Sequence, residues 1–207
     1  MIAPLAALLA RAFDDDPMMA WVFPDPVRRA RDLRRLFAAN LRHADRTGRL
    51  DAESVDGGSV GVALWLGPGA FPMPAWRTLL TGHALLPFGF TLTSLARLRR
   101  LNAYALMQHR RTIAGPHWFL HGVGVEPDRQ RQGIGTALLR AGLERADRDR
   151  LPCYLETARE SALPFYSRFG FRVAIPGRLP GDGPPVFSLL RPAAVKRPAA
   201  SAAPARA

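Results

Sequence analysis

The sequence predicts a single α/β domain in which a mixed sheet is flanked by helices. Three observations lead to this prediction. The chain has 207 residues, close to the usual size of one domain. Hydrophobic residues make up 48% and charged residues 22%, which excludes a wholly disordered chain. In the second half of the chain, apolar runs of strand length alternate with segments of helical periodicity.

Two helices and a β-hairpin are predicted for the first part of the chain. Asp25 followed by Pro26 is the N-cap and first-turn pattern of the second helix, and Asp56-Gly57-Gly58 is the turn signal of a hairpin. The predicted ranges are 4–13 and 26–46 for the helices, and 50–55 and 59–66 for the strands. The apolar stripe of the second helix is expected to consist of Val27, Ala30, Leu33, Phe37, Leu41 and Ala44.

The middle of the chain is predicted to be a helical insertion. Residues 78–96 form a run of 19 that contains no Asp, Glu, Lys or Arg, a length that approaches a membrane span. Pro87 and its neighbouring glycines argue against one continuous spanning helix. We therefore expect two short helices that meet near Pro87, followed by a basic helix over 97–111.

Strands and helices alternate in the last part of the chain. The predicted strands are 118–125, 153–157, 171–175 and 186–190, and the predicted helices are 133–150 and 162–169. We treat residues 1–190 as one domain. Residues 191–207 are rich in alanine, proline and basic residues, which predicts a disordered tail.

The charge balance is unusual, because 29 basic residues oppose 17 acidic ones and the formal net charge is +12. An excess of this size invites a nucleic-acid interpretation. However, Lys196 is the one lysine, and abundant Arg, Ala, Pro and Gly indicate a GC-rich coding bias, so nucleic acid is not the expected partner.

A single cysteine excludes an internal disulfide and a cysteine-rich zinc site. Without a convincing secretory signal we expect a cytoplasmic protein with no metal and no membrane partner.

The segment with the clearest chemistry joins a predicted strand to a predicted helix. A helix N-terminus presents unpaired N–H groups and a partial positive charge, and Gly133 and Gly135 remove the side chains that would keep an anion away from it. Arg129 and Arg131 add formal charge. The segment predicts a pyrophosphate cradle, and the alternative is a tight turn without a ligand. It is neither a Walker A loop nor a dinucleotide fingerprint.

Two blocks of this sequence resemble the GNAT superfamily of N-acetyltransferases. Gln130-x-x-Gly133-x-Gly135 matches the Q/R-x-x-G-x-G/A signature of that family in the expected strand–turn–helix context. Leu155-Glu156-Thr157 and the run Pro164–Phe171 are similar to its second block, which usually ends F-Y-x-x-x-G-F. Together the blocks cover residues 118–173. More narrowly, they look like puromycin N-acetyltransferase and its relatives.

The resemblance implies a GNAT-like, mostly antiparallel twisted sheet. Family members usually open with a strand, whereas this sequence starts almost at the first helix, so either the start is truncated or misassigned or that edge strand is absent. The resemblance also implies acetyl-CoA as co-substrate, with its pantetheine arm on the backbone around Val123 and Val125. The residues implied to hold its pyrophosphate are Gln130, Arg131, Gln132, Gly133, Ile134, Gly135 and Thr136. Many members carry Asn where Arg159 stands.

The implied reaction is direct transfer of acetyl to a primary amine of a small molecule. Tyr166 is the expected acid that protonates the departing thiolate, and the alternative is a tyrosine packed for its ring. An amine with a pKa of about 10 is mostly protonated at neutral pH, so a base is useful. Glu156 and His121 are the candidates. The alternatives are a salt bridge from Glu156 to an arginine and an ordinary strand histidine.

Four further expectations concern the surroundings of the site. Gly122 and Gly124 are expected to leave room for a ligand beside the strand, and a bulge without function is the alternative. The acidic run Asp14–Asp16 either attracts a cationic substrate or merely ends the first helix. Cys153 is expected to be a small buried residue rather than a nucleophile. Residues 73–111 are expected to shape the acceptor pocket.

Two other functions remain open from the sequence. The same fold acetylates protein N-termini or lysines, and a degenerate relative without catalysis acts as a CoA-binding or nucleic-acid-binding regulator. Tyr166 and the intact cradle favour an enzyme. A homo-oligomer is compatible with the sequence.

Overall fold

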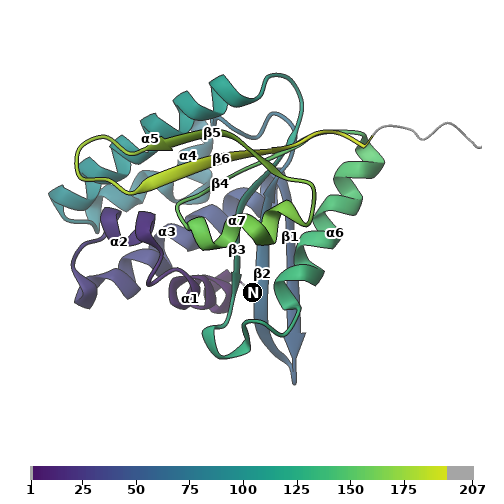
Figure 1. Cartoon of the computed structure of the whole chain (residues 1–207). Coiled ribbons are helices and arrows are strands. Elements are labelled where there is room, and N and C mark those ends of the chain that lie inside the picture. The colour runs from purple at the N-terminus through teal and green to yellow at the C-terminus, as the bar shows by residue number, and fades with distance from the viewer. Residues whose placement is uncertain (1, 195–207) are drawn as a thin grey trace, which may run out of the picture.

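The computed structural model describes residues 2–194, which fold into one open six-stranded sheet with helices on both faces (Figure 1). The strands are β1 (Gly48–Val55), β2 (Gly58–Leu66), β3 (Trp118–Val125), β4 (Cys153–Thr157), β5 (Arg172–Arg178) and β6 (Pro185–Arg191). The α-helices are α1 (Ile2–Ala12), α2 (Pro17–Val22), α3 (Pro26–Thr47), α4 (Ala75–Thr81), α5 (Leu92–Thr112), α6 (Ile134–Asp149) and α7 (Leu163–Ser167). The 3₁₀ turns are η1 (His83–Phe88), η2 (Pro127–Arg129) and η3 (Glu160–Ala162).

The sheet confirms the predicted fold class. Its strand order is β1-β2-β3-β4-β6-β5, and every neighbouring pair is antiparallel except β3 and β4. Within residues 2–194 no strand precedes α1, and β1, the first strand of the hairpin, forms one edge of the sheet.

Two apolar clusters hold the helices to the sheet, one on each face. On one face Leu64 and Tyr154 pack with residues of α1, α3 and α5. On the other, Trp65 and Leu120 pack with α6 and α7. Because neighbouring residues of a strand point to opposite faces, each central strand contributes to both clusters. In Figure 1, α1, α2 and α3 gather at the lower left and α6 lies at the right.

The N-cap pattern appears twice in the structure. Asp25 caps α3 as predicted, and its side chain accepts hydrogen bonds from the N–H groups of Val27 and Arg28. Asp16 does the same for α2, where Met18 and Met19 donate. Helix α2 was not predicted, although Asp16-Pro17 repeats the Asp25-Pro26 signal.

The predicted apolar stripe of α3 is wrong in its first turn. Val27 is 88% exposed and Ala30 is also exposed, whereas the later members from Leu33 onward are buried. The first turn of α3 extends beyond the cluster that covers the rest of the helix, so apolar side chains there have nothing to pack against.

The insertion contains two short helical segments as expected, α4 and η1, but the predicted junction near Pro87 is wrong: the segments meet at Gly82, whose left-handed backbone ends α4, and Pro87 lies inside η1. The following helix, α5, begins at Leu92 and runs without a break to Thr112, so the basic helix is longer than predicted. None of the described helices is long and apolar enough to cross a membrane.

The last strand ends at Arg191, one residue beyond the predicted domain boundary. The Arg191 guanidinium donates two hydrogen bonds to the Asp147 carboxylate, at 2.6 and 2.9 Å, which ties β6 to α6. Residues 195–207, the greater part of the predicted tail, lie outside the described residues.

Helix α6 approaches the sheet closely through Gly142. A Cβ atom at this position would lie 2.1 Å from the ring of Trp65, which is fully buried. Helix propensity alone predicts that Gly142→Ala stabilises the protein by about 1 kcal/mol. We expect the opposite sign, a loss of ~1–3 kcal/mol in the free energy of unfolding measured by urea denaturation.

Ala141→Gly, on the exposed side of the same helix, calibrates the propensity effect. In a Trp65→Leu background the cost of Gly142→Ala should fall, because the ring that opposes the new methyl group is gone. A stabilised Gly142→Ala variant would contradict the packing described for α6.

Candidate active site

The central feature of the site is the point where the two parallel strands separate. Strands β3 and β4 are paired at Trp118↔Cys153, Phe119↔Tyr154 and Leu120↔Leu155, and their pairing ends there. His121 and Glu156 are the first residues beyond the last pair on each strand. The two candidate bases therefore lie at the opening of the fork between β3 and β4.

A bulge in β3 coincides with this fork. On the β2 side, Leu120 is opposite Trp65 and Gly122 is opposite Leu64, so His121 is an extra residue without a partner. Residues 122–125 remain paired with β2 only. The backbone groups that point toward β4 have no ladder partner among the described residues, and an extended polar ligand is what satisfies such groups. Val123 and Val125 belong to this free edge.

The free edge leads directly to the N-terminus of α6. Gly133 is the N-cap residue, adopts a left-handed backbone with φ +86°, and provides no side-chain cap. A Cβ atom there would meet nothing within 4 Å. The first N–H groups of a 16-residue helix thus face an open space, which is the arrangement that binds phosphate oxygens.

The remaining cradle residues are arranged around this helix end. Gln130 donates to the carbonyl of Val125 (3.3 Å) and Gln132 to that of Asp128 (3.4 Å), which folds both amides back onto the loop. Arg131 is exposed and adopts φ +62°. The first-turn residues of α6 that were predicted to bind the co-substrate are Ile134, Gly135 and Thr136, all partly buried.

One of the two glycines of β3 has a different role from the one predicted. A Cβ on Gly124 would lie 2.7 Å from Leu9 and 3.1 Å from Ala12, and one on Gly122 would lie 3.9 Å from Phe13. These contacts belong to α1 and the turn after it. Gly124 allows that helix to approach the sheet, so the space beside it is filled by α1 and the expectation that it leaves room for a ligand is wrong; a Cβ on Gly122 would make only an ordinary contact.

Glu156 is a desolvated carboxyl group with a single strong partner. The Tyr154 hydroxyl donates to it at 2.6 Å. Burial raises the pKa of Glu156 to about 7, and the tyrosine hydrogen bond opposes this increase. Among the described ion pairs none involves Glu156, so the predicted alternative, a salt bridge to an arginine, is not found there.

His121 lines the opening of the fork. Its ring stacks on Phe119 with centroids 5.3 Å apart. The surrounding protein lowers the pKa of the imidazole by desolvation, although the side chain remains accessible to solvent. The lowered pKa favours the neutral form of the exposed His121 ring at the fork.

Tyr166 is held by its ring rather than by its hydroxyl. The ring lies 5.2 Å from that of Phe165 and 6.1 Å from that of Phe171, and the residue is 9% exposed. Within residues 2–194 the hydroxyl makes no hydrogen bond. Burial, followed by the charge of Asp16, raises the pKa of Tyr166 to about 12, so the group is protonated at every physiological pH.

Arg159, for which the sequence predicted no role, connects the acidic run Asp14–Asp16 to the segment that follows β4. Arg159 forms an ion pair with Asp15 and lies 3.7 Å from Asp16. Burial raises the pKa of Asp16, which is also the cap of α2. Both carboxylates therefore have partners within the protein: Asp15 pairs with Arg159, and Asp16 caps α2 and lies near the same arginine. The proximity of Asp16 to Tyr166 brings the α1–α2 turn to the site, and nothing in the sequence spacing indicates that contact.

Two other features lie apart from the fork. Cys153 is buried and its thiol pKa is raised to about 12, so it is not a nucleophile.

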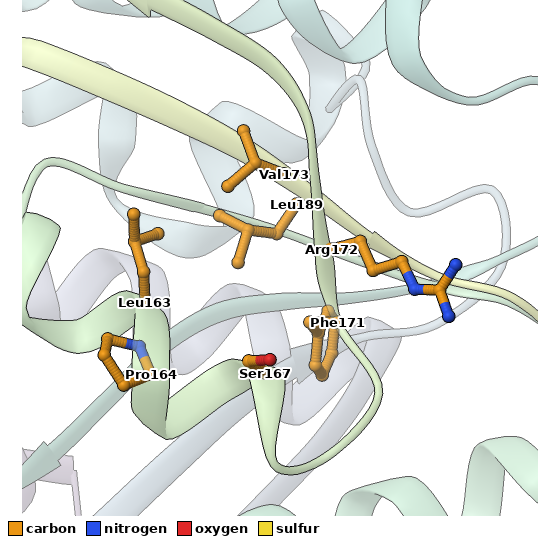
Figure 2. A pocket seen from close by; sticks show the side chains of 7 residues that line it. All are labelled: Leu163, Pro164, Ser167, Phe171, Arg172, Val173 and Leu189. Carbon is orange, nitrogen blue, oxygen red and sulfur yellow. The ribbon is translucent and has the colours of Figure 1, made fainter.

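A pocket of about 300 Å³ lies between α7 and strands β5 and β6 (Figure 2). It is lined by Leu163, Pro164, Ser167, Phe171, Arg172, Val173 and Leu189, and includes none of the predicted site residues.

Comparison with known proteins agrees with this geometry. Residues 83–171 match the model of the Acetyltransferase (GNAT) family. A crystal structure of histone acetyltransferase HPA2 and related acetyltransferase from Corynebacterium glutamicum is similar over 94% of this chain and 92% of that chain, with 27% identity and a TM-score of 0.65. Arylalkylamine N-acetyltransferase 2 from Aedes aegypti shares the fold, covering 92% and 93% of the two chains with a TM-score of 0.57 and 12% identity.

A sequence relative aligns over a shorter stretch. The mycothiol acetyltransferase of Clavibacter sepedonicus is 40% identical over 73 residues, which is 30% of this chain. The aligned part is 24% of the length of that enzyme. The matched residues, the sheet order and the structural likeness over 94% of the chain together show that the chain has the GNAT fold, and residues 83–171 resemble the acetyltransferases of that family.

Proposed function

We propose that the protein is an acetyl-CoA-dependent N-acetyltransferase that moves an acetyl group directly to a primary amine of a small molecule. The observation that carries this proposal is the continuous path from the free edge of β3 to the uncapped N-terminus of α6. One side of this path offers strand-like hydrogen bonds, and its end offers N–H groups to an anion. An extended amide-containing arm that ends in a pyrophosphate, as in acetyl-CoA, has this pattern of groups.

The fork places proton acceptors where the acyl group arrives. Glu156 has a pKa of about 7, so roughly half is ionised at neutral pH and it accepts a proton from the attacking nitrogen, directly or through water. Attack forms the nitrogen–carbon bond, and the carbon–sulfur bond then breaks to release a thiolate. No covalent enzyme intermediate is needed, which agrees with the inert Cys153.

Tyr166 is the proposed donor of the proton that the thiolate requires. Its hydroxyl has no partner to give up within the described residues and is fully protonated. With a pKa of about 12, donation to a thiolate of ordinary pKa is uphill by ~5 kcal/mol. The same desolvation that raises the pKa of the tyrosine also raises that of the thiolate beside it, which reduces this difference.

An acceptor on a protein is the second candidate. The C. glutamicum structure, described as a histone acetyltransferase and related acetyltransferase, favours it, whereas the mycothiol acetyltransferase favours a small molecule. The narrower resemblance to puromycin N-acetyltransferases remains a prediction. Thiol release measured with aminonucleosides, aminoglycosides, polyamines, amino acids and N-terminal peptides separates these classes. Absence of turnover with every amine, despite acetyl-CoA binding, would favour a non-catalytic regulator.

Replacing Gly133 tests the cradle. We expect Gly133→Val to weaken acetyl-CoA binding at least tenfold, or about 1.4 kcal/mol, by titration calorimetry, because a side chain there would occupy the space in front of the α6 N–H groups. Gly57→Val is the matched control, since Gly57 also has a positive φ and open space around its Cβ but lies in the β1–β2 turn. Equal affinity in the two folded variants would refute the cradle.

The pH dependence tests Glu156. If a neutral amine and an ionised Glu156 are both required, log kcat/KM should rise with increasing pH. Its limiting slope should be two below about pH 7 and one from there up to the pKa of the amine. Glu156→Gln should lower kcat/KM and leave a slope of one throughout. Tyr154→Phe removes the hydrogen bond that lowers the pKa of Glu156, so the break should move to higher pH. An unchanged profile in Glu156→Gln would assign the base to His121 or to solvent.

Tyr166→Phe tests the acid. The ring packing is retained and the hydroxyl is lost, so kcat should fall ~10²–10⁴-fold while acetyl-CoA affinity changes little. The defect should shrink with an acyl donor whose leaving thiol has a lower pKa. Single-turnover measurement shows whether chemistry limits the rate. A chemistry-limited Phe variant with full activity would exclude Tyr166 as the acid.

A further inference from the structure

A cluster of exposed apolar side chains lies in the insertion between β2 and β3. We call it the insertion patch, and its residues are Trp76, Leu79, Leu80, Leu85, Phe88 and Leu92. Phe88 is 89% exposed and Leu92 is 87% exposed. Single exposed apolar residues are common, but six large ones within one short segment of α4, η1 and the start of α5 are not. This concentration indicates that the segment contacts something apolar.

The insertion itself carries charge of one sign, and two acids beside it, Asp32 and Asp182, are paired with Arg31 and Arg97. From Gly57 to Val125 the sequence contains no Asp or Glu and six arginines, one on α4 (Arg77) and five on α5. The Arg77 guanidinium lies 4.8 Å from the Trp76 ring centroid.

Helix α3 adds further arginines beside the same segment. Arg31 and Arg42 each reach a carbonyl of the insertion, at Gly89 and Thr81, both at 3.4 Å. The Arg35 guanidinium packs against Gly89 so closely that a Cβ there would overlap it. All three side chains belong to exposed residues. Their contacts hold a row of three guanidinium groups along one side of the insertion patch, in which Arg31 also pairs with Asp32 and the other two carry the net positive charge.

We propose that the insertion patch is a docking surface for an anionic lipid bilayer, with its apolar side chains at the headgroup–acyl boundary and the arginines on lipid phosphates. Apolar side chains including a tryptophan, next to an excess of arginines over acids, are the features of an interfacial segment. Binding of this kind lies on the membrane and does not cross it. The sequence-based expectation of no membrane partner considered only a spanning helix, and the inference departs from it.

The charge distribution disfavours a second copy of the chain as the occupant. A two-fold interface through the insertion patch would place the arginine row of one copy near that of the other, or near the uniformly basic insertion. Like charges at the rim of a protein interface oppose association. Lipid phosphates supply the opposite charge.

Vesicle binding tests the proposal without using enzymatic activity. Of the four tryptophans, Trp21, Trp65 and Trp118 are buried, so Trp76 is the reporter. With vesicles of phosphatidylglycerol and phosphatidylcholine at low salt, we expect cosedimentation, a blue shift of the emission and protection from acrylamide. Trp76→Phe should bind with little spectral change. Pure phosphatidylcholine vesicles should bind at least tenfold more weakly, and salt should weaken binding to the anionic vesicles.

Matched variants separate the apolar and the charged contributions. Leu79→Ser with Phe88→Ser should reduce binding at least tenfold, and Val27→Ser, equally exposed but on the first turn of α3, should not. Arg35→Gln with Arg42→Gln should abolish the preference for anionic lipid, whereas Arg148→Gln on α6 should preserve it. No binding to anionic vesicles at low salt would overturn the proposal. It would also be overturned by concentration-dependent self-association that the Leu79→Ser, Phe88→Ser variant abolishes, without vesicle binding.

Discussion

The early end of the β3–β4 pairing is the constraint on which the rest of the site depends. Two parallel strands that stay in contact would satisfy each other's backbone groups and leave no edge for a ligand. Here the contact ends at Leu120↔Leu155, and the bulge at His121 lies directly after it. The free edge of β3, the position of Glu156 and the direction of the chain into the α6 N-terminus all follow from that one separation.

Desolvation is the second influence that runs through the site. It raises the pKa values of Glu156, Tyr166 and Asp16, and it lowers that of His121. Each shift favours the neutral form, so the fork is a region where charge is costly. Such a region suits the proposed reaction, in which a neutral amine attacks a neutral thioester and charge develops only between the reactants and the products.

Much of the fold could be predicted from the sequence because its signals are local. Asp25-Pro26, Asp56-Gly57-Gly58 and the Gly133 helix start each act over a few residues, and the corresponding elements are found at those positions. Helix α2 was missed although Asp16-Pro17 carries the same local signal. Long-range contacts left no such signal. The approach of α1 to Gly124, the Tyr154 hydrogen bond to Glu156 and the Arg159 contact with Asp15 depend on how distant segments pack.

The bulge at His121 also changes the alternation of side chains along β3. Before it, Phe119 faces the α1 side and Leu120 the α6 side. After it, Gly122 and Gly124 face α1, while Val123 and Val125 pack on the α6 side. Without the extra residue the parity would invert, and valines would point at Leu9 and Ala12, where a single Cβ already overlaps. The side chain at position 121 can therefore be exchanged, but the residue itself cannot be deleted. A deletion would turn every side chain from residue 122 to residue 125 to the opposite face of the sheet.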